Sequence, residues 1–286
     1  MAEQETVRHY DAQYGQFASG LYTEIRTAAF GGDIGQNGWV TAGEHDLFIR
    51  WLDLDAASHL LDVACGSGRT TLRIARVTGC SVQGIDIHPA AIAAATEAAR
   101  DESLSERAGF DVVDASQRLP FPDASFDGLI CTDALNHLPD RPAVFREWAR
   151  VLRPGGRLVF TDPIVVTGAL TNAEIAVRAS IGFFVFVPPG LDEQMLRESG
   201  FETTDVVDRT ENMAESARRW HDARAVRSVD LRRIEGDATF DGQQTFLQVA
   251  ARLAAERRLS RMAYRAVRSE LSGAPSAART HRAVRS

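Results

Sequence analysis

Between residues 59 and 163, short continuous apolar runs alternate with longer segments in which apolar positions recur every three or four residues. A short apolar run is typical of a strand buried on both faces of a sheet, and the longer spacing is typical of an amphipathic helix. The predicted strands are 59–65, 81–87, 109–116, 126–132 and 157–163, and the predicted helices are 66–79, 88–104 and 141–156. This alternation predicts a parallel, doubly wound sheet.

The pattern is looser on both sides of this core. The polar, helix-like N-terminal region ends in a glycine-rich stretch at 30–44, which predicts a loop before a short helix at 43–52. After residue 163 we expect an insertion at about 164–189, then a helix at 190–200, a sixth strand at 201–210, a helical insertion at about 211–260 and a seventh strand at 260–267. The predicted organisation is therefore an N-terminal helical cap (1–44), a main domain (45–270) whose two insertions form a lid, and a disordered tail (271–286).

Composition excludes several classes of function. The 286-residue chain has 32 basic and 39 acidic residues, a net charge of −7, so it lacks the positive field that binding to nucleic acid needs. Every basic residue is arginine, which excludes lysine chemistry such as a Schiff base and indicates a GC-rich, bacterial genome. We therefore expect a small-molecule partner and no nucleic acid; the sequence leaves the oligomeric state open.

The cysteines and the apolar runs bear on the compartment. Cys65, Cys80 and Cys131 are scattered, so they predict buried apolar side chains rather than disulfides or a zinc site. The polar start is unlike a signal peptide, and no apolar run approaches the ~20 residues of a membrane span. A cytoplasmic protein with no membrane contact and no metal is expected.

Polar and glycine residues follow three successive predicted strands, at the edge where an open α/β sheet binds its ligand. Gly66 and Gly68 follow the first strand and permit a tight turn with close approach to a ligand. Asp86 ends the second strand and is placed to accept hydrogen bonds from both hydroxyls of a ribose. Asp114 ends the third and is placed near an adenine amino group. Together they predict an adenosine-binding site, although each aspartate could instead only cap a local turn or helix.

Two cofactors fit an adenosine-binding site of this kind. A nicotinamide dinucleotide requires G-x-G-x-x-G, and the third position here is Thr71. S-adenosylmethionine needs only the tight turn because it has no pyrophosphate, and the acid Asp62 within the first strand fits it too. The spacing therefore favours S-adenosylmethionine. The alternatives are an NAD-dependent oxidoreductase and a non-catalytic scaffold that binds the cofactor.

The motifs "LLDVACGSG", "GIDIHP", "VVDAS", "LPFPDASFDGLICTDALNHLPD" and "LRPGGRLVFTDP" resemble the class I S-adenosylmethionine-dependent methyltransferases, small-molecule branch (methyltransferase type 11). The resemblance implies a Rossmann-like fold with a mainly parallel seven-stranded sheet and helical cap insertions. It places the methionine part of the cofactor at the first strand end, the ribose at the second and the adenine at the third, with a further contact after the fourth. The implied cofactor residues are Asp62, Ala64, Gly66, Gly68, Asp86, Ile87, Asp114, Ala115 and Thr132.

The stretch "CTDALNHL" at 131–138 leaves the fourth strand at the side where a methyl acceptor would lie. It is similar to the phosphoethanolamine methyltransferases, whose aspartate and histidine at this spacing are implicated in catalysis. The resemblance makes Asp133 and His137 the candidate catalytic residues, with histidine suited to a base because it titrates near neutrality. It also implies a tyrosine from the N-terminal cap, for which Tyr10, Tyr14 and Tyr22 are candidates.

The acceptor is expected to be a small molecule with apolar or aromatic character, methylated on nitrogen, oxygen or an activated carbon, as in natural product biosynthesis. The insertion "ASIGFFVFVPPG" is aromatic where a phosphate-binding pocket would need cations. Ordinary core packing remains an alternative for its aromatic side chains and for the cap tryptophan. The candidate pocket residues are Tyr14, Tyr22, Phe183, Phe184 and Trp220.

Overall fold

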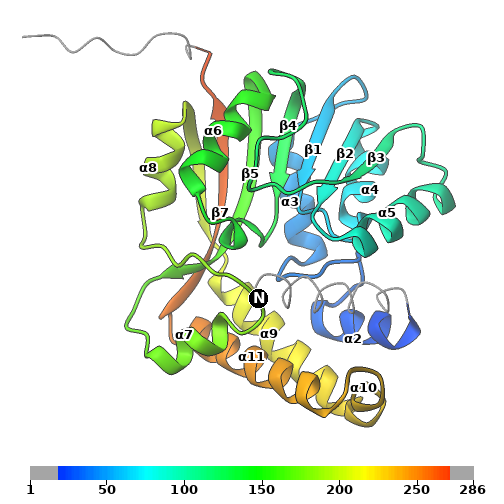
Figure 1. Cartoon of the computed structure of the whole chain (residues 1–286), viewed down its shortest axis with the longest axis vertical. Helices are drawn as coiled ribbons and strands as arrows, with labels where there is room; N and C mark the ends of the chain where they lie inside the picture. Colours follow the sequence, from blue (N-terminus) through cyan, green and yellow to red (C-terminus); the bar gives the residue numbers. More distant parts are fainter. Residues whose placement is uncertain (1–18, 271–286) are drawn as a thin grey trace, which may run out of the picture.

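A computed structural model describes residues 19–270 and contains a seven-stranded sheet in the order β3-β2-β1-β4-β5-β7-β6 (Figure 1). Only β7 runs antiparallel to its neighbours, so the predicted mainly parallel, doubly wound Rossmann-like sheet is confirmed. The strands are β1 (His59–Val63), β2 (Ser81–Asp86), β3 (Ala108–Val112), β4 (Phe126–Cys131), β5 (Leu152–Val166), β6 (Phe201–Asp208) and β7 (Leu259–Arg268).

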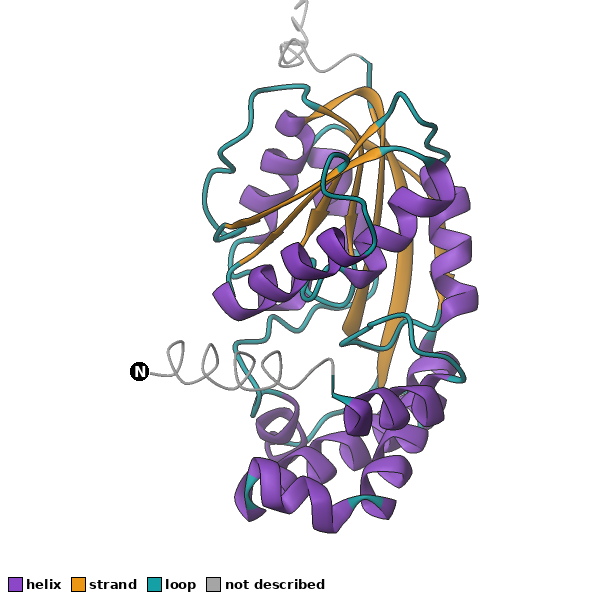
Figure 2. Cartoon of the chain, turned by 90° about the vertical axis from the view of Figure 1, so that its right-hand side faces the viewer, coloured by secondary structure: helices purple, strands orange, loops and turns teal. Residues whose placement is uncertain are grey.

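Helices cover both faces of the sheet (Figure 2). They are α2 (Gly20–Phe30), α3 (Ala42–Leu52), α4 (Arg69–Thr78), α5 (Pro89–Asp101), α6 (Arg141–Val151), α7 (Asn172–Arg178), α8 (Leu191–Glu198), α9 (Thr210–Val226), α10 (Ser228–Glu235) and α11 (Asp237–Ala255), with a 3₁₀ turn, η1, at Leu135–His137. Leu60 packs with α3 and α4 on one face, and Leu61 packs with α6 and α8 on the other. Because successive strand side chains point to opposite faces, a strand covered on both faces needs the continuous apolar run seen in the sequence.

The cap is a separate helical layer beyond the carboxyl ends of the strands (Figures 1 and 2). One apolar cluster joins Trp39 to Met213 and Ala217 of α9 and Phe246 of α11. Helix α2 joins α10 and α11 through a second cluster, which includes Ile25. The predicted second insertion therefore packs with the N-terminal segment over the edge where the strands end.

Some predicted boundaries are wrong. Strand β3 ends at Val112 rather than at residue 116; it is the edge strand, and Asp114 uses its side chain to form a turn with Ser116 instead of continuing the sheet. Strand β5 begins at Leu152, inside the segment predicted to close a helix, and continues to Val166. Strand β4 pairs with Leu152 and again with residues 157–160, and β7 pairs with β5 from Arg157 to Val166. The N-terminal positions 1–18 and the predicted tail at 271–286 lie outside the described residues.

The described residues contain no membrane-spanning helix and no cluster of metal-binding side chains. No helix between residues 19 and 270 is long and apolar enough to cross a bilayer. Within the same range, no group of three or more histidine, cysteine, aspartate or glutamate side chains is arranged to hold a metal ion. The three cysteines are buried and unpaired by disulfides, as the sequence predicts.

Candidate functional site

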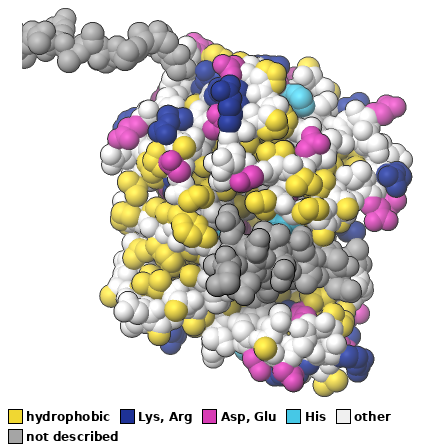
Figure 3. Space-filling view, in the orientation of Figure 1, with side chains coloured by type: hydrophobic (Ala, Val, Ile, Leu, Met, Phe, Trp, Pro, Cys, Tyr) yellow, Lys and Arg dark blue, Asp and Glu magenta, His cyan; other side chains and the backbone are white. Residues whose placement is uncertain are grey.

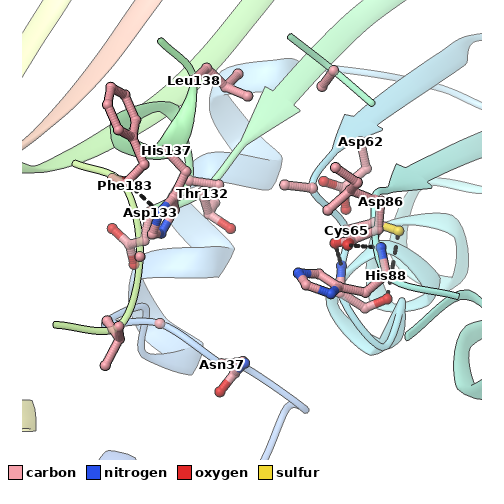
Figure 4. A pocket seen from close by; sticks show the side chains of 18 of the residues that line it. Asn37, Asp62, Cys65, Asp86, His88, Thr132, Asp133, His137, Leu138 and Phe183 are labelled. Atoms are coloured by element: carbon pink, nitrogen blue, oxygen red, sulfur yellow. Dashed lines mark hydrogen bonds between the residues drawn. The ribbon is translucent and has the colours of Figure 1, made fainter. Parts of the chain in front are cut away.

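A cavity of about 920 Å³ lies at the carboxyl ends of β1, β2 and β4, between residues 35–40 and a strap formed by residues 179–187 (Figure 4). Most of the residues predicted from the sequence line it. These are Asp62, Ala64, Gly66, Asp86, Ile87, Asp114, Ala115, Thr132, Asp133, His137, Phe183 and Phe184. Segments widely separated in the sequence therefore meet at one cavity.

The turn after β1 brings backbone to the cavity edge. Ala64, Gly66 and Gly68 all have positive φ angles, of 58°, 56° and 68°, a conformation that favours glycine. Gly66 lines the cavity, but Gly68 does not, since it starts α4 and packs behind the turn. A Cβ on Gly68 would lie 2.6 Å from the Cβ of Ala95 and 2.7 Å from the Phe110 ring. The structure thus gives Gly68 a packing role.

Asp86 is held by backbone hydrogen bonds on both carboxylate oxygens. The amide of Gly66 donates to Oδ2 at 2.9 Å, and the amide of His88 donates to Oδ1 at 3.0 Å. The residue is only 5% exposed, and burial raises its pKa above the usual aspartate value. Each carboxylate oxygen can accept two hydrogen bonds, so Asp86 retains acceptor capacity for a ligand with two hydroxyl groups.

Asp62 lies at the same end of the cavity and is almost fully buried. Burial raises its pKa to about 7, although the Thr71 hydroxyl opposes this by donating to Asp62 Oδ2 at 2.5 Å. A cationic ligand group would favour the ionised form of such a carboxyl. Thr71, noted in the sequence only for not being glycine, is therefore the partner of Asp62.

The third strand end supplies a mixed polar and apolar edge. Asp114 Oδ1 accepts hydrogen bonds from the amide and the hydroxyl of Ser116, at 2.9 and 2.7 Å. Any hydrogen bond from a ligand would therefore fall to Oδ2. Ile87 lines the cavity and is 41% exposed, so part of its apolar side chain is open to contact with a ligand. A flat aromatic ligand group would cover it.

Asp133 and His137 both line the cavity, but no hydrogen bond joins them among the described residues. Asp133 pairs with Arg261, which approaches Oδ1 at 2.6 Å through Nε and Oδ2 at 3.2 Å through Nη2. Arg261 also donates to both carboxylate oxygens of Glu44, at 2.7 and 2.8 Å. No sequence motif marks this buried network, because its members are too far apart in the chain.

His137 is oriented by the strap (Figure 4). Its Nδ1 lies 3.0 Å from the carbonyl oxygen of Phe183, and its ring meets Phe184 edge to face at 4.7 Å. Burial lowers the pKa of His137 to about 4, below the near-neutral value expected from the sequence for a histidine base, so the imidazole is neutral at physiological pH. Because a carbonyl can only accept, Nδ1 carries the proton and Nε2 is the basic nitrogen.

The remaining predicted pocket residues are differently placed. Tyr22 donates its hydroxyl to Glu235 at 2.5 Å within the cap, and Trp220 packs edge to face against Phe30 and Trp39. Neither is among the cavity-lining residues, and Tyr14 lies outside the described part of the chain. Apolar side chains also gather on the side of the molecule that carries α7 and α8 (Figure 3). Phe183, which lines the cavity, is 58% exposed.

Buried arginines surround the cavity without lining it. Arg141 contacts Asp162 at 2.6 Å and Asp192 at 2.8 Å, and Arg261 contacts Asp133 and Glu44. The Arg178 guanidinium lies over the rings of Trp39, Phe184 and Phe246, at 5.9, 5.9 and 4.3 Å. Among residues 19–270, no arginine lines the cavity, whose ionisable side chains are carboxylates, histidines and the Cys65 thiol.

Comparison with known proteins agrees with this arrangement. Residues 61–160 match a family model described as a methyltransferase domain. Methyltransferase GfsG of Streptomyces halstedii is 44% identical over 44% of this chain and 45% of its own length. The 27-O-demethylrifamycin SV methyltransferase of Amycolatopsis mediterranei is 37% identical over 57% of this chain and 61% of its own length. The matches thus span about half to three fifths of these curated relatives.

Solved structures share the fold over nearly the whole chain. The cyclopropane synthase MmaA2 of Mycobacterium tuberculosis has a TM-score of 0.78 at 17% identity, covering 92% of this chain and 98% of its own. A phosphoethanolamine N-methyltransferase of Haemonchus contortus has a TM-score of 0.76 at 20% identity, covering 91% and 59%. The [4+2]-cyclase SpnF has a TM-score of 0.74 at 24% identity, covering 94% and 96%. Since one of these is a cyclase, the shared fold alone does not specify the reaction.

Proposed function

We propose that this chain, whose residues 61–160 belong to the methyltransferase-domain family, transfers a methyl group from S-adenosylmethionine to a small-molecule acceptor. The observation that carries the proposal is the placement of Asp62, Gly66 and Asp86 along one side of a single cavity. Opposite them, His137 and the aromatic strap form a second side, on which an acceptor would lie (Figure 4).

The residues present suit the cofactor. S-adenosylmethionine, when bound, supplies an electrophilic methyl group on a sulfonium. Asp86 would accept hydrogen bonds from the ribose hydroxyls, and Ile87 would cover one face of the adenine. Asp114 Oδ2 would take the adenine amino group. Asp62 would lie nearest the methionine ammonium, since its raised pKa reflects a buried carboxyl that a cation would stabilise in the ionised form.

The chain's own contribution to the reaction is orientation and proton transfer. The cavity would hold the acceptor atom close to the methyl group and exclude water, and such positioning can lower a barrier by several kcal/mol. An attacking hydroxyl, amine or phenol must also lose a proton. His137 is the candidate base because Nδ1–H is committed to Phe183, which leaves Nε2 as the basic nitrogen.

The acceptor we infer is uncharged, with apolar or aromatic surface, and is methylated on nitrogen, oxygen or an activated carbon. A phosphate or carboxylate would need a cationic partner, and the buried arginines near the cavity are already held by carboxylates or aromatic rings. Phe183 and Phe184 instead offer apolar contact surface. One similar protein is named for a rifamycin, which supports an acceptor from natural product biosynthesis. We further propose that the cap and the two insertions close over this acceptor, in a bacterial, cytoplasmic protein.

A panel of acceptors tests this function. The purified chain should release S-adenosylhomocysteine with neutral phenols, hydroxylated aromatics or macrolide-like alcohols, and much more slowly with phosphoethanolamine or dimethylglycine. Faster turnover of the charged acceptors would overturn the proposed acceptor class. Cofactor binding with no transfer to any acceptor would favour a scaffold or a non-methylating enzyme.

A further inference from the structure

We propose that Asp133 is a positioning residue: held by Arg261, it fixes residues 37–39 as a wall of the cavity and so sets the room available to the acceptor. This inference rests on the proposed function, because an effect on the acceptor requires that the chain methylates one. The contact of Asp133 with residues 37–39 can be tested without an acceptor. It reassigns the residue that the family resemblance pairs with His137 as part of a catalytic dyad.

The Asp133 carboxylate has no capacity left to accept another hydrogen bond. Its Oδ1 accepts from the Thr161 hydroxyl at 2.8 Å and from Arg261 Nε at 2.6 Å. Its Oδ2 accepts from the Trp39 amide at 2.7 Å and from Arg261 Nη2 at 3.2 Å. A carboxylate offers about four lone-pair positions, and these four bonds use them. Asp133 therefore cannot take a proton from an acceptor, or orient His137, without breaking an existing bond.

Asp133 also lies directly against the wall formed by residues 37–39. Gly38 lines the cavity, and a Cβ added there would lie 2.7 Å from Asp133 Oδ2 and 3.1 Å from its Cβ. The backbone of residues 37–39 can therefore lie against Asp133 only because residue 38 has no side chain. Asp133 itself has a positive φ of 53°, which turns its side chain out of the β4 line toward this segment.

The wall is attached to the rest of the protein at both of its ends. At the end near the glycine turn, the Ser67 hydroxyl approaches the carbonyl oxygen of Gly35 at 3.5 Å. At the other end, Trp39 donates its amide to Asp133 and buries its ring in the cap. Gln36, Asn37 and Gly38 line the cavity between these points. A change at Asp133 would thus loosen the acceptor end of the wall, where the Trp39 ring still packs in the cap, and would leave the cofactor end attached.

Arg261 keeps this arrangement rigid. Its side chain is fully buried, and its ion pairs with Asp133 and Glu44 hold both carboxylates in fixed positions. Glu44 also accepts from the Asn212 side chain of α9 at 2.9 Å. The end of β4, the start of α3 and the cap are thereby joined through one guanidinium, whose planar group can bond two carboxylates at once.

Two substitutions test the inference, each on the full-length protein. Gly38→Ala should raise the acceptor KM about tenfold or more, with the larger effect on bulkier acceptors, while the S-adenosylmethionine Kd changes less than about twofold. Gly43→Ala is the matched control, because a Cβ there meets nothing within 4 Å. Asp133→Asn should likewise act mainly on acceptor KM and should leave the shape of the kcat–pH profile unchanged.

A catalytic Asp133 would behave differently. If Asp133→Asn lowers kcat a hundredfold or more and removes a titrating limb from the pH profile, while Gly38→Ala leaves acceptor KM unchanged, the positioning role is wrong. A readout independent of activity separates this failure from that of the proposed function. In hydrogen exchange, Asp133→Asn should speed exchange at the Trp39 amide at least tenfold without affecting β1. Unchanged exchange would overturn the inference even if no acceptor is ever methylated.

Discussion

Arg261 of β7 and Asp133, just after β4, are 128 residues apart in the chain and form a two-point ion pair with N–O distances of 2.6 and 3.2 Å. Both side chains are almost fully buried, and Glu44 completes the group. Desolvation makes a buried ion pair costly to break from one side, because the remaining charge has no water to solvate it. The pair therefore bears on stability as well as on the cavity.

Replacing Arg261 by alanine should lower the free energy of unfolding by about 3–5 kcal/mol, since it leaves the Asp133 carboxylate buried without its cation and leaves Glu44 only the longer, 3.5 Å contact with Arg209. Urea denaturation followed by circular dichroism measures the change. Arg218→Ala on the exposed face of α9 serves as the control and should lower the stability much less, because its ion pairs are in contact with solvent. Equal effects of the two substitutions would contradict a structural role for the buried network.

Replacing Asp86 by alanine should weaken S-adenosylmethionine binding at least tenfold, or about 1.4 kcal/mol, because the ribose hydroxyls lose their acceptors. Isothermal titration calorimetry measures the Kd directly. Asp101→Ala, on an exposed residue at the end of α5, controls for the loss of a negative charge. An unchanged Kd for Asp86→Ala would refute the ribose assignment.

The raised pKa of Asp62 predicts a pH dependence of cofactor binding. Burial places this pKa at about 7, so most of the carboxyl is protonated at pH 5.5 and about half is ionised at pH 7. A cationic methionine group binds the ionised form, and its ammonium stays protonated below about pH 7.7. The affinity for S-adenosylmethionine should therefore rise roughly tenfold between pH 5.5 and 7. Asp62→Asn should abolish the rise; a slope that persists in this variant would assign it to another group.

Replacing His137 by alanine should lower kcat about a hundredfold or more, in line with the loss of a general base, while the S-adenosylmethionine Kd stays nearly constant. Because burial lowers its pKa to about 4, protonation of His137 should not reduce kcat between pH 6 and 8. His221→Ala, a partly exposed histidine on α9, is the matched control. Normal turnover of His137→Ala would make the histidine a wall residue only.

The sheet was predictable because its signal is local. The apolar side chains of residues 59–65 predict a strand by themselves. The aspartates and glycines that follow such strands indicate the binding site without any long-range information. The β3 and β5 boundaries were less predictable. An edge strand such as β3 has exposed positions that weaken the apolar pattern. Pro154 and Gly155 resemble a helix end, and they lie in the first part of β5, between its pairing to β4 at Leu152 and at Arg157.

The contacts of the candidate site were predictable only in part. Asp86 was found because its position at a strand end determines its surroundings. Asp133 was found by the same reasoning, but its partners come from the segment before α3, from β5 and from β7, and no local pattern identifies Arg261 among 32 arginines. The contacts of the strap were also predictable only in part. The sequence shows the aromatic residue Phe183, but the hydrogen bond between its carbonyl oxygen and His137 depends on how the insertion folds.

The central claim is that the cavity binds S-adenosylmethionine at the ends of β1, β2 and β3. Calorimetric titration of the purified chain tests it most directly, with S-adenosylmethionine in one experiment and NAD in another. We expect a single binding event for S-adenosylmethionine and no binding of NAD. In Asp86→Ala, the affinity for S-adenosylmethionine should be lost or weakened at least tenfold. Binding of NAD without binding of S-adenosylmethionine would contradict it.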